Sequence, residues 1–218
     1  MALSDDIYDK LTNDESSDSS QPREVQSSDD VPTSFVLILA SSFLTKLGDA
    51  ITSPKTTLAW VSTAVGAPAY VLGFLVPLRE SGSMIPQIFI GGVIRRLPRR
   101  KWVWVLGSCG QCLCIVGIGV TAWLLEGKTA GWMILLLITL FSIARSFSSV
   151  ASKDVLGKTI PKPKRGQLTG WSASAAGLLS VGVGVLIMTP VGDQLDESLL
   201  GLLLFGAAGL WILAAVIY

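Results

Sequence analysis

Five charged side chains stand inside long apolar stretches of this sequence: Lys46, Asp49, Arg79, Glu80 and Arg145. A charge near the middle of a membrane-spanning helix costs about 2.5 to 3.5 kcal/mol, so such residues pair with one another or line a polar cavity. Three cations against two carboxylates favour an anionic ligand, and a carboxyl group in apolar surroundings can take up a proton. We interpret the five residues as a candidate pathway for a substrate or a proton. The alternative is that they form buried ion pairs that fix the register of neighbouring helices.

The spacing of these residues indicates how they could meet. Lys46 and Asp49 are three positions apart, which places them on one helix face and within reach of each other. Arg79 and Glu80 are adjacent and point about 100° apart on a helix, so each needs a partner on another segment. With a rise of about 1.5 Å per residue, we expect Arg79 and Glu80 near the middle of the membrane, Lys46 beyond the midplane and Arg145 toward the cytoplasm.

Other reactive residues do not form a catalytic or metal-binding pattern. The sequence contains no histidine, which removes imidazole metal ligands and Ser-His nucleophiles. Cys109, Cys112 and Cys114 fall within one apolar run, where free cysteine behaves as a small hydrophobic residue. We therefore expect no catalytic residue, no metal and no cofactor, and we do not expect an enzyme.

The elements that must hold the charges are apolar. Half of the 218 residues are hydrophobic and only 15% are charged, whereas charged residues make up about a quarter of a typical soluble domain. Charge is also segregated, since nine of the 16 acidic residues precede residue 31 and 15 of the 17 basic residues follow it. Residues 1–32 are predicted to form a disordered acidic tail, because they have too little apolar surface to offset the entropy of ordering.

The remainder, residues 33–218, is predicted to be an all-α, polytopic membrane domain of six transmembrane helices. A span needs about 20 apolar residues. Residues 56–67 are expected to form an outer connection with a short interfacial helix around Trp60, followed by one long kinked span that contains Arg79 and Glu80. The approximate spans are 33–52, 68–94, 102–125, 132–152, 167–190 and 199–218.

Two short basic segments set the expected orientation. Five cationic side chains crowd residues 95–101, and a second basic segment covers residues 158–166. Because Lys and Arg are enriched in cytoplasmic loops, both segments are predicted to be cytoplasmic. An even number of spans then puts both termini on the cytoplasmic side of a cell membrane, plasma or inner.

The first basic segment resembles the loop between the second and third spans of the major facilitator superfamily, which has the pattern Gly-x-x-x-Asp-Arg-x-Gly-Arg-Arg. The matching residues are Gly91, Arg96, Arg99 and Arg100. Arg95 stands at the family's acidic position, and Pro98 stands at its second glycine. In the family, that acid helps to latch the cytoplasmic ends of two six-helix halves.

Two further matches extend the resemblance to about residues 33–218. Arg145 falls where the family often carries a membrane-embedded arginine implicated in proton coupling, and residues 154–166 resemble its loop between the fourth and fifth spans. The resemblance implies the amino-terminal six-helix half of a secondary transporter. It also implies cytoplasmic gating loops that contain Gly91, Arg95, Arg96, Arg99, Arg100, Asp154, Arg165 and Gly166.

The resemblance further implies a set of partners. Members of the family usually have twelve spans in two halves, and the substrate cavity lies between the halves, which rock to give alternating access. The implied partners are the lipid bilayer, a small-molecule solute of anionic character, protons, and a second six-helix half or a homodimer partner; no nucleic-acid partner is expected. We expect a truncated half, because the sequence ends within its sixth apolar run. The alternatives are a complete protein that dimerises, a non-transporting membrane scaffold or inactive fragment and, with less support, an intramembrane enzyme.

Overall fold

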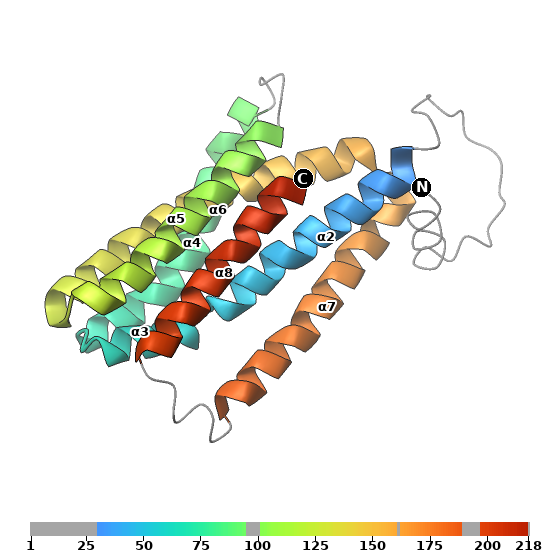
Figure 1. The fold of residues 1–218 in the computed structure, drawn as a ribbon. Coiled ribbons are helices and arrows are strands. Elements are labelled where there is room, and N and C mark those ends of the chain that lie inside the picture. The colour runs from blue at the N-terminus through green and yellow to red at the C-terminus, as the bar shows by residue number, and fades with distance from the viewer. Residues whose placement is uncertain (1–29, 95–100, 161, 189–196, 218) are drawn as a thin grey trace.

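The computed structural model describes residues 30–94, 101–160, 162–188 and 197–217, and every regular element in them is a helix. This confirms the all-α class for the described part of the chain. Seven helices run through these residues (Figure 1). Their bounds are α2 Asp30–Ile51, α3 Thr57–Ala64, α4 Ala69–Ile94, α5 Lys101–Leu124, α6 Gly127–Thr159, α7 Lys162–Met188 and α8 Glu197–Ile217.

Two of the described helices are long and apolar enough to cross a membrane. They cover Trp102–Leu124 in α5, with 23 residues, and Gly127–Thr159, which is α6, with 33 residues. Their length and composition suit these helices to association with a membrane. The expected spans that correspond to α2, α4, α7 and α8 remain predictions.

The chain enters the bundle along a broken helical path. α2 ends at Ile51, a turn around Pro54 follows, and α3 begins at Thr57. Proline has no backbone N–H to donate and disfavours helical geometry before it, so Pro54 explains the break. α3 contains Trp60, as expected, but its Leu58 and Val61 are buried in the main core. The short helix therefore packs into the bundle.

The second basic segment is mostly helical, which corrects the loop predicted for residues 158–166. α6 continues to Thr159 and α7 begins at Lys162, so Asp154 lies on α6 while Arg165 and Gly166 lie at the start of α7. Pro163 fits there, because the first turn of a helix needs no N–H from proline. Charged turns prolong both helices here, so this run of basic residues does not mark a long loop.

The ends of two other predicted segments also shift. α2 begins at Asp30, so residues 30–32 of the predicted tail are helical, and Pro32 again occupies a first turn. Gly91 lies in the last turn of α4. The rest of the predicted tail and the gating-loop residues Arg95, Arg96, Arg99 and Arg100 lie outside the described residues.

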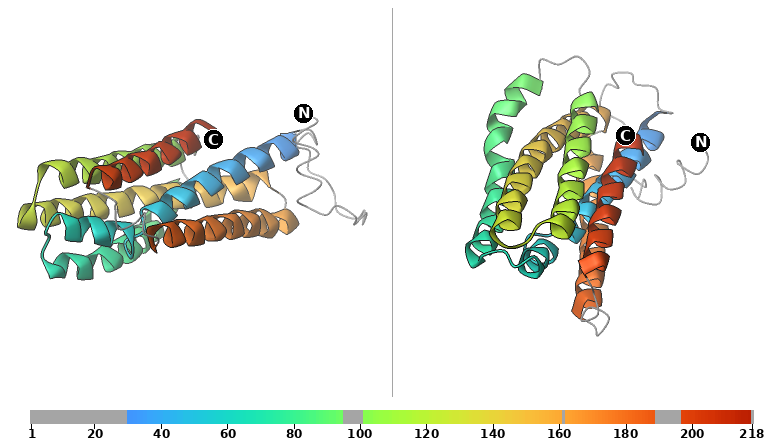
Figure 2. Two further views of the ribbon diagram at one scale, coloured as in Figure 1. Left: turned by 60° about the horizontal axis from the view of Figure 1, so that its bottom comes forward. Right: turned by 60° about the vertical axis from the view of Figure 1, so that its left-hand side comes forward.

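The long helices pack in a repeating pattern. α2 packs against α7 and α8, α6 packs against α4 and α5, and α5 packs against α8. Exchanging α2 with α6, α4 with α7 and α5 with α8 reproduces each of these pairings. α2 and α6 run in opposite directions (Figure 1), and Figure 2 shows the bundle from two further sides. This matching of the pairings of α2, α4, α5 with those of α6, α7, α8 is the pattern that an inverted repeat gives.

The main core joins α3, α4, α5, α6 and α8. Phe141 and Trp211 are fully buried and meet edge to face, with ring centroids 5.6 Å apart. A Cβ atom on Gly48 would lie 3.1 Å from the Trp211 ring, so glycine is what lets α2 approach this ring. The guanidinium carbon of Arg79 lies 4.9 Å from the Phe141 centroid, in a cation–π contact. The apolar core thus packs against the buried guanidinium group of Arg79.

Candidate functional site

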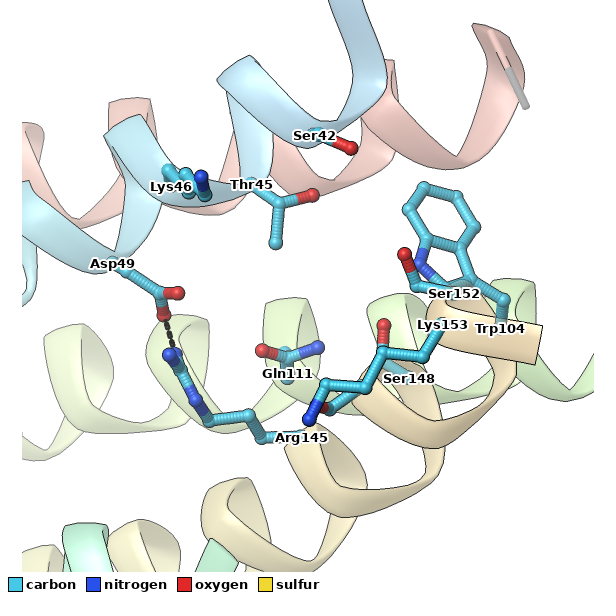
Figure 3. A pocket seen from close by; sticks show the side chains of 11 residues that line it. Ser42, Thr45, Lys46, Asp49, Trp104, Gln111, Arg145, Ser148, Ser152 and Lys153 are labelled. Carbon is cyan, nitrogen blue, oxygen red and sulfur yellow. Dashed lines mark hydrogen bonds and ion pairs between the residues drawn. The ribbon is translucent and has the colours of Figure 1, made fainter. Parts of the chain in front are cut away.

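A polar pocket of about 190 Å³ lies between α2, α5 and α6 (Figure 3). Its charged lining consists of three cations, Lys46, Arg145 and Lys153, and one carboxylate, Asp49. Hydroxyl groups, an indole and an amide complete the wall: Ser42, Thr45, Trp104, Gln111, Ser148, Ser149 and Ser152. A concave site with a few convergent polar groups and a surplus of cations suits a small anionic ligand.

Most of this lining comes from two matched stripes. The stripe on α2 runs from residue 42 through 45 and 46 to 49, and the stripe on α6 runs from 145 through 148 and 149 to 152. Both follow the spacing i, i+3, i+4, i+7, which gathers four side chains on one helix face. The exchange that matches the helix pairings pairs α2 with α6, so the two stripes lie on corresponding helices of the two units.

Asp49 closes one end of the pocket by pairing with two arginines. Its Oδ1 accepts a hydrogen bond from Arg145 on α6 and another from Arg79 on α4, whose Nη2 lies 3.1 Å away. The side chain of Arg145 is 34% exposed, whereas that of Arg79 is 6% exposed. Arg145 is therefore the arginine that a ligand in the pocket can reach.

Arg79 caps the broken end of α2. Its guanidinium donates to the carbonyl oxygen of Thr52 and, over 3.3 Å, to that of Asp49. The last carbonyls of a helix have no partner within the helix, and a cation there also interacts favourably with the helix dipole. Arg79 does not line the pocket. It instead holds Asp49 in place through their ion pair, from outside the pocket lining.

Small residues on α4 and α6 bring Arg79 to this position. Ser146 Oγ on α6 donates to the carbonyl oxygen of Ser83 on α4 at 2.6 Å. A Cβ atom on Gly82 would lie 3.0 Å from Cβ of Ser142. Such close approach between small side chains is common where helices pack in lipid. It carries α4 near enough for Arg79 to reach across to α2.

Lys46 has a different partner from the one predicted. Its Nζ donates to Ser172 Oγ on α7 at 2.7 Å and lies 3.4 Å from the carbonyl oxygen of Thr169. The predicted contact with Asp49 is replaced, because Asp49 turns toward α4 and α6 while α7 packs on the other side of Lys46. Lys46 therefore links α2 to α7 at the edge of the pocket.

Glu80 lies outside the cluster. Its side chain is exposed and forms no ion pair within the described residues. Adjacent residues on a helix point about 100° apart, and only Arg79 turns toward α2. The prediction that Glu80 also pairs with another span is wrong for the described part of the chain.

Gln111 is one of eight pocket residues that were not predicted from the sequence. It is 0% exposed, its Nε2 lies 3.3 Å from the carbonyl oxygen of Gly107, and its Oε1 has no hydrogen-bond partner in the described part of the chain. A lone amide in the uncharged run over residues 102–125 was the available signal. The equal spacing of polar residues on α2 and α6 was a second one.

The predicted gating residues that the structure describes lie away from the pocket. Asp154 pairs with Lys158 one helical turn later, with 3.8 Å between Oδ2 and Nζ. Arg165 donates to the carbonyl oxygen of Ile160 at 2.7 Å and to that of Gly157, so it closes the turn between α6 and α7. Gly91 and Gly166 have open space around them.

The chemistry that this site can perform is reversible binding of charge. Arg145 can exchange the carboxylate of Asp49 for an anionic ligand, and Asp49 remains held by Arg79 when it does so.

Comparisons of this chain with protein-family models, with curated proteins and with solved structures find no match.

Proposed function

We propose that this chain is the amino-terminal six-helix half of a secondary transporter, which carries a small anionic solute across a cell membrane by alternating access. The single observation that carries the proposal is the pocket, where three cations and one carboxylate line a recess between apolar helices. Lys46 and Arg145 are partly buried and Lys153 is exposed, so the surplus positive charge of the lining favours an anion as compensation. The solute is expected to supply that compensation.

The lengths of the helices support a membrane location. α2, α4, α5, α6, α7 and α8 contain 22, 26, 24, 33, 27 and 21 residues, and about 20 residues suffice to cross a bilayer. Large apolar side chains also point outward, with Ile88, Leu178 and Val216 each more than three-quarters exposed. Such side chains suit contact with lipid.

The distribution of charge supports an inward-facing arrangement. The pocket extends from the Asp49–Arg145 pair toward Trp104 and Lys153, near the end of the bundle at which α5 begins and α6 ends. Lys101 at the start of α5 and Lys158 in the last turn of α6 belong to this same end, which the positive-inside rule makes cytoplasmic.

The inverted-repeat pattern of helix pairings supports the transporter class. Inverted three-helix units recur within each six-helix half of major facilitator transporters, and substrates bind where repeats meet.

Glu80, exposed at mid-length on α4, would be costly in lipid, so we expect a second half or a second copy to cover it. Asp49 is the carboxylate that a coupling proton would reach when Arg145 is engaged by the solute.

Binding of anions to the purified chain tests this function. In detergent micelles, malate, lactate and inorganic phosphate are titrated while the melting temperature is followed, with glucose as the neutral probe. At least one anion is expected to stabilise the wild type, and Arg145→Gln is expected to abolish the effect. Lys55→Gln is the matched control, because Lys55 is exposed outside the pocket. Stabilisation that survives Arg145→Gln, or that glucose equals, contradicts the proposal.

Movement of the solute is the second measurement. The chain is reconstituted in liposomes, and uptake of the anion that binds is compared with uptake by protein-free liposomes under an imposed pH gradient. Two copies of the chain are expected to assemble in the liposomes and to complete the cavity. Uptake of the anion should then depend on Arg145 and Asp49. Uptake that is indifferent to Arg145→Gln and Asp49→Asn together is incompatible with the assigned pathway.

A further inference from the structure

The side-chain oxygen of Gln111 has no hydrogen-bond partner within the described residues, although the residue is fully buried. Oε1 accepts no hydrogen bond within the described residues, and Nε2 reaches only the carbonyl oxygen of Gly107, 3.3 Å away, which belongs to its own helix. A buried polar group without a hydrogen-bond partner is energetically unfavourable. In Figure 3 the amide of Gln111 projects from α5 into the space between α2 and α6, where it lines the pocket. A ligand or a water molecule that enters the pocket can supply this partner once the amide turns toward it.

Close packing of α5 on α6 puts Gln111 there. A Cβ atom on Gly107 would lie 2.8 Å from the carbonyl oxygen of Ala144 and from the amide nitrogen of Ser148. A Cβ atom on Gly110 would lie 3.0 Å from Cβ of Ala144. The two glycines therefore let α6 lie directly on α5, and Gln111 follows them in the sequence and lines the pocket, as Arg145 does from α6.

Hydroxyl groups around the pocket are also free to bind. Within the described chain, no hydrogen bond joins the side-chain hydroxyls of Ser42, Ser148, Ser149 and Ser152 to another protein group, although all four residues line the pocket. A hydroxyl group both donates and accepts. The uncharged part of the pocket can thus satisfy a ligand that is itself rich in hydroxyl groups.

We infer that the pocket selects a compact organic oxyanion that carries a hydroxyl group, such as a hydroxycarboxylate or a polyol phosphate, with Arg145 holding the oxyanion and Gln111 the hydroxyl. The inference rests on the proposed function and names its substrate class. An amide can turn over to present either its oxygen or its NH2 group. A ligand hydroxyl matches both orientations, whereas an alkyl group in the same place matches neither.

The size of the pocket limits the ligand. Its volume of about 190 Å³ somewhat exceeds the roughly 150 Å³ of an apolar cavity that holds benzene. A molecule of about ten non-hydrogen atoms or fewer fits this space.

Matched pairs of anions that differ only in hydroxyl groups test the inference. Binding of malate against succinate, lactate against propionate, and glycerol 3-phosphate against propyl phosphate is measured by calorimetry on the full chain in micelles. In at least one pair the hydroxylated member is expected to bind about tenfold or more tightly, since a site built to bond a hydroxyl rejects analogues that lack it. The preferred pair also distinguishes a carboxylate ligand from a phosphate.

Three variants separate the inference from the proposed function. Gln111→Leu is expected to reduce the preference to about one and to leave binding of the hydroxyl-free member within about threefold of wild type, while Arg145→Gln abolishes binding of both members. Gln111→Asn keeps an amide and is expected to retain part of the preference, which guards against a folding defect in Gln111→Leu. Gln87→Leu is the matched control, because Gln87 makes the same local bond, to the Ser83 carbonyl at 2.8 Å, outside the pocket.

Each outcome has a separate meaning. Equal binding of both members of every pair, unchanged by Gln111→Leu, overturns the inference and leaves the anion pocket standing. Absence of binding by all six anions overturns the proposed function and the inference together. Loss of the preference in Gln87→Leu as well as in Gln111→Leu assigns it to helix packing and also overturns the inference.

Discussion

Nη2 of Arg79 and Oδ1 of Asp49 lie 3.1 Å apart, and this ion pair joins α4 to α2 at the point where α2 breaks. Arg145 donates to the same carboxylate oxygen from α6. One carboxylate therefore pairs with two arginines that differ in how far their side chains are exposed to the pocket. Arg79 is buried and fixed to backbone carbonyls, while Arg145 faces the pocket.

The first prediction concerns these two arginines. Arg79→Gln is expected to lower the free energy of unfolding by about 3 kcal/mol or more, because it removes one partner of a buried ion pair and frees the carbonyls at the end of α2. Arg145→Gln is expected to cost about 1 kcal/mol or less, since its side chain is partly exposed. Denaturation in micelles measures both. Glu80→Gln, a change at an exposed neighbour, controls for charge. A cost for Arg145→Gln as large as that for Arg79→Gln would show that the two do not differ in role.

The second prediction concerns helix packing at Gly107. Gly107→Ala is expected to destabilise the chain by about 1–3 kcal/mol, because the new Cβ atom would meet backbone atoms of α6 at 2.8 Å. Gly73→Ala is the matched control on α4, where nothing lies within 4 Å of the added atom. That change is expected to be neutral or to stabilise by about 0.5–1 kcal/mol. Melting temperatures compare the two, and similar shifts would contradict the close contact.

The third prediction concerns the link between α2 and α7. Lys46→Met removes the bond to Ser172 and is expected to speed amide hydrogen exchange in α7, because hydrogen bonds to charged groups contribute about 1.5–3 kcal/mol. Ser172→Ala is expected to have a smaller effect in the same direction. Lys55→Met, at an exposed position, should leave exchange unchanged. Unaltered exchange in α7 of Lys46→Met would rule out the link.

The fourth prediction concerns topology. In a chain whose native cysteines are replaced by serine, Thr63→Cys in α3 and Lys128→Cys at the start of α6 are expected to react with an impermeant reagent from the outer side. Lys158→Cys near the end of α6 is expected to react from the cytoplasmic side. All three positions are exposed. Reaction of Thr63→Cys from the cytoplasmic side alone would overturn the six-span arrangement.

Local rules were enough to predict the helices. Apolar runs bounded by charges and prolines gave elements close to α2, α4, α5 and α8, because a long apolar segment has few alternatives to a helix. They failed at the end of α6 and the start of α7, where charged turns continue a helix without apolar residues. The sequence also indicated which charges are unusual, since their cost in apolar surroundings does not depend on the fold.

The partners of those charges were decided by the tertiary structure. Asp49 lies within reach of Lys46 along its own helix, yet it pairs with Arg79 and Arg145, 30 and 96 positions away. Glu80 was predicted to join the cluster and faces outward instead. The place of Gln111 depends on glycines that let α6 lie on α5. The type and spacing of residues determine which helix face is polar, but only the packing of helices distant in sequence determines which polar faces lie opposite one another.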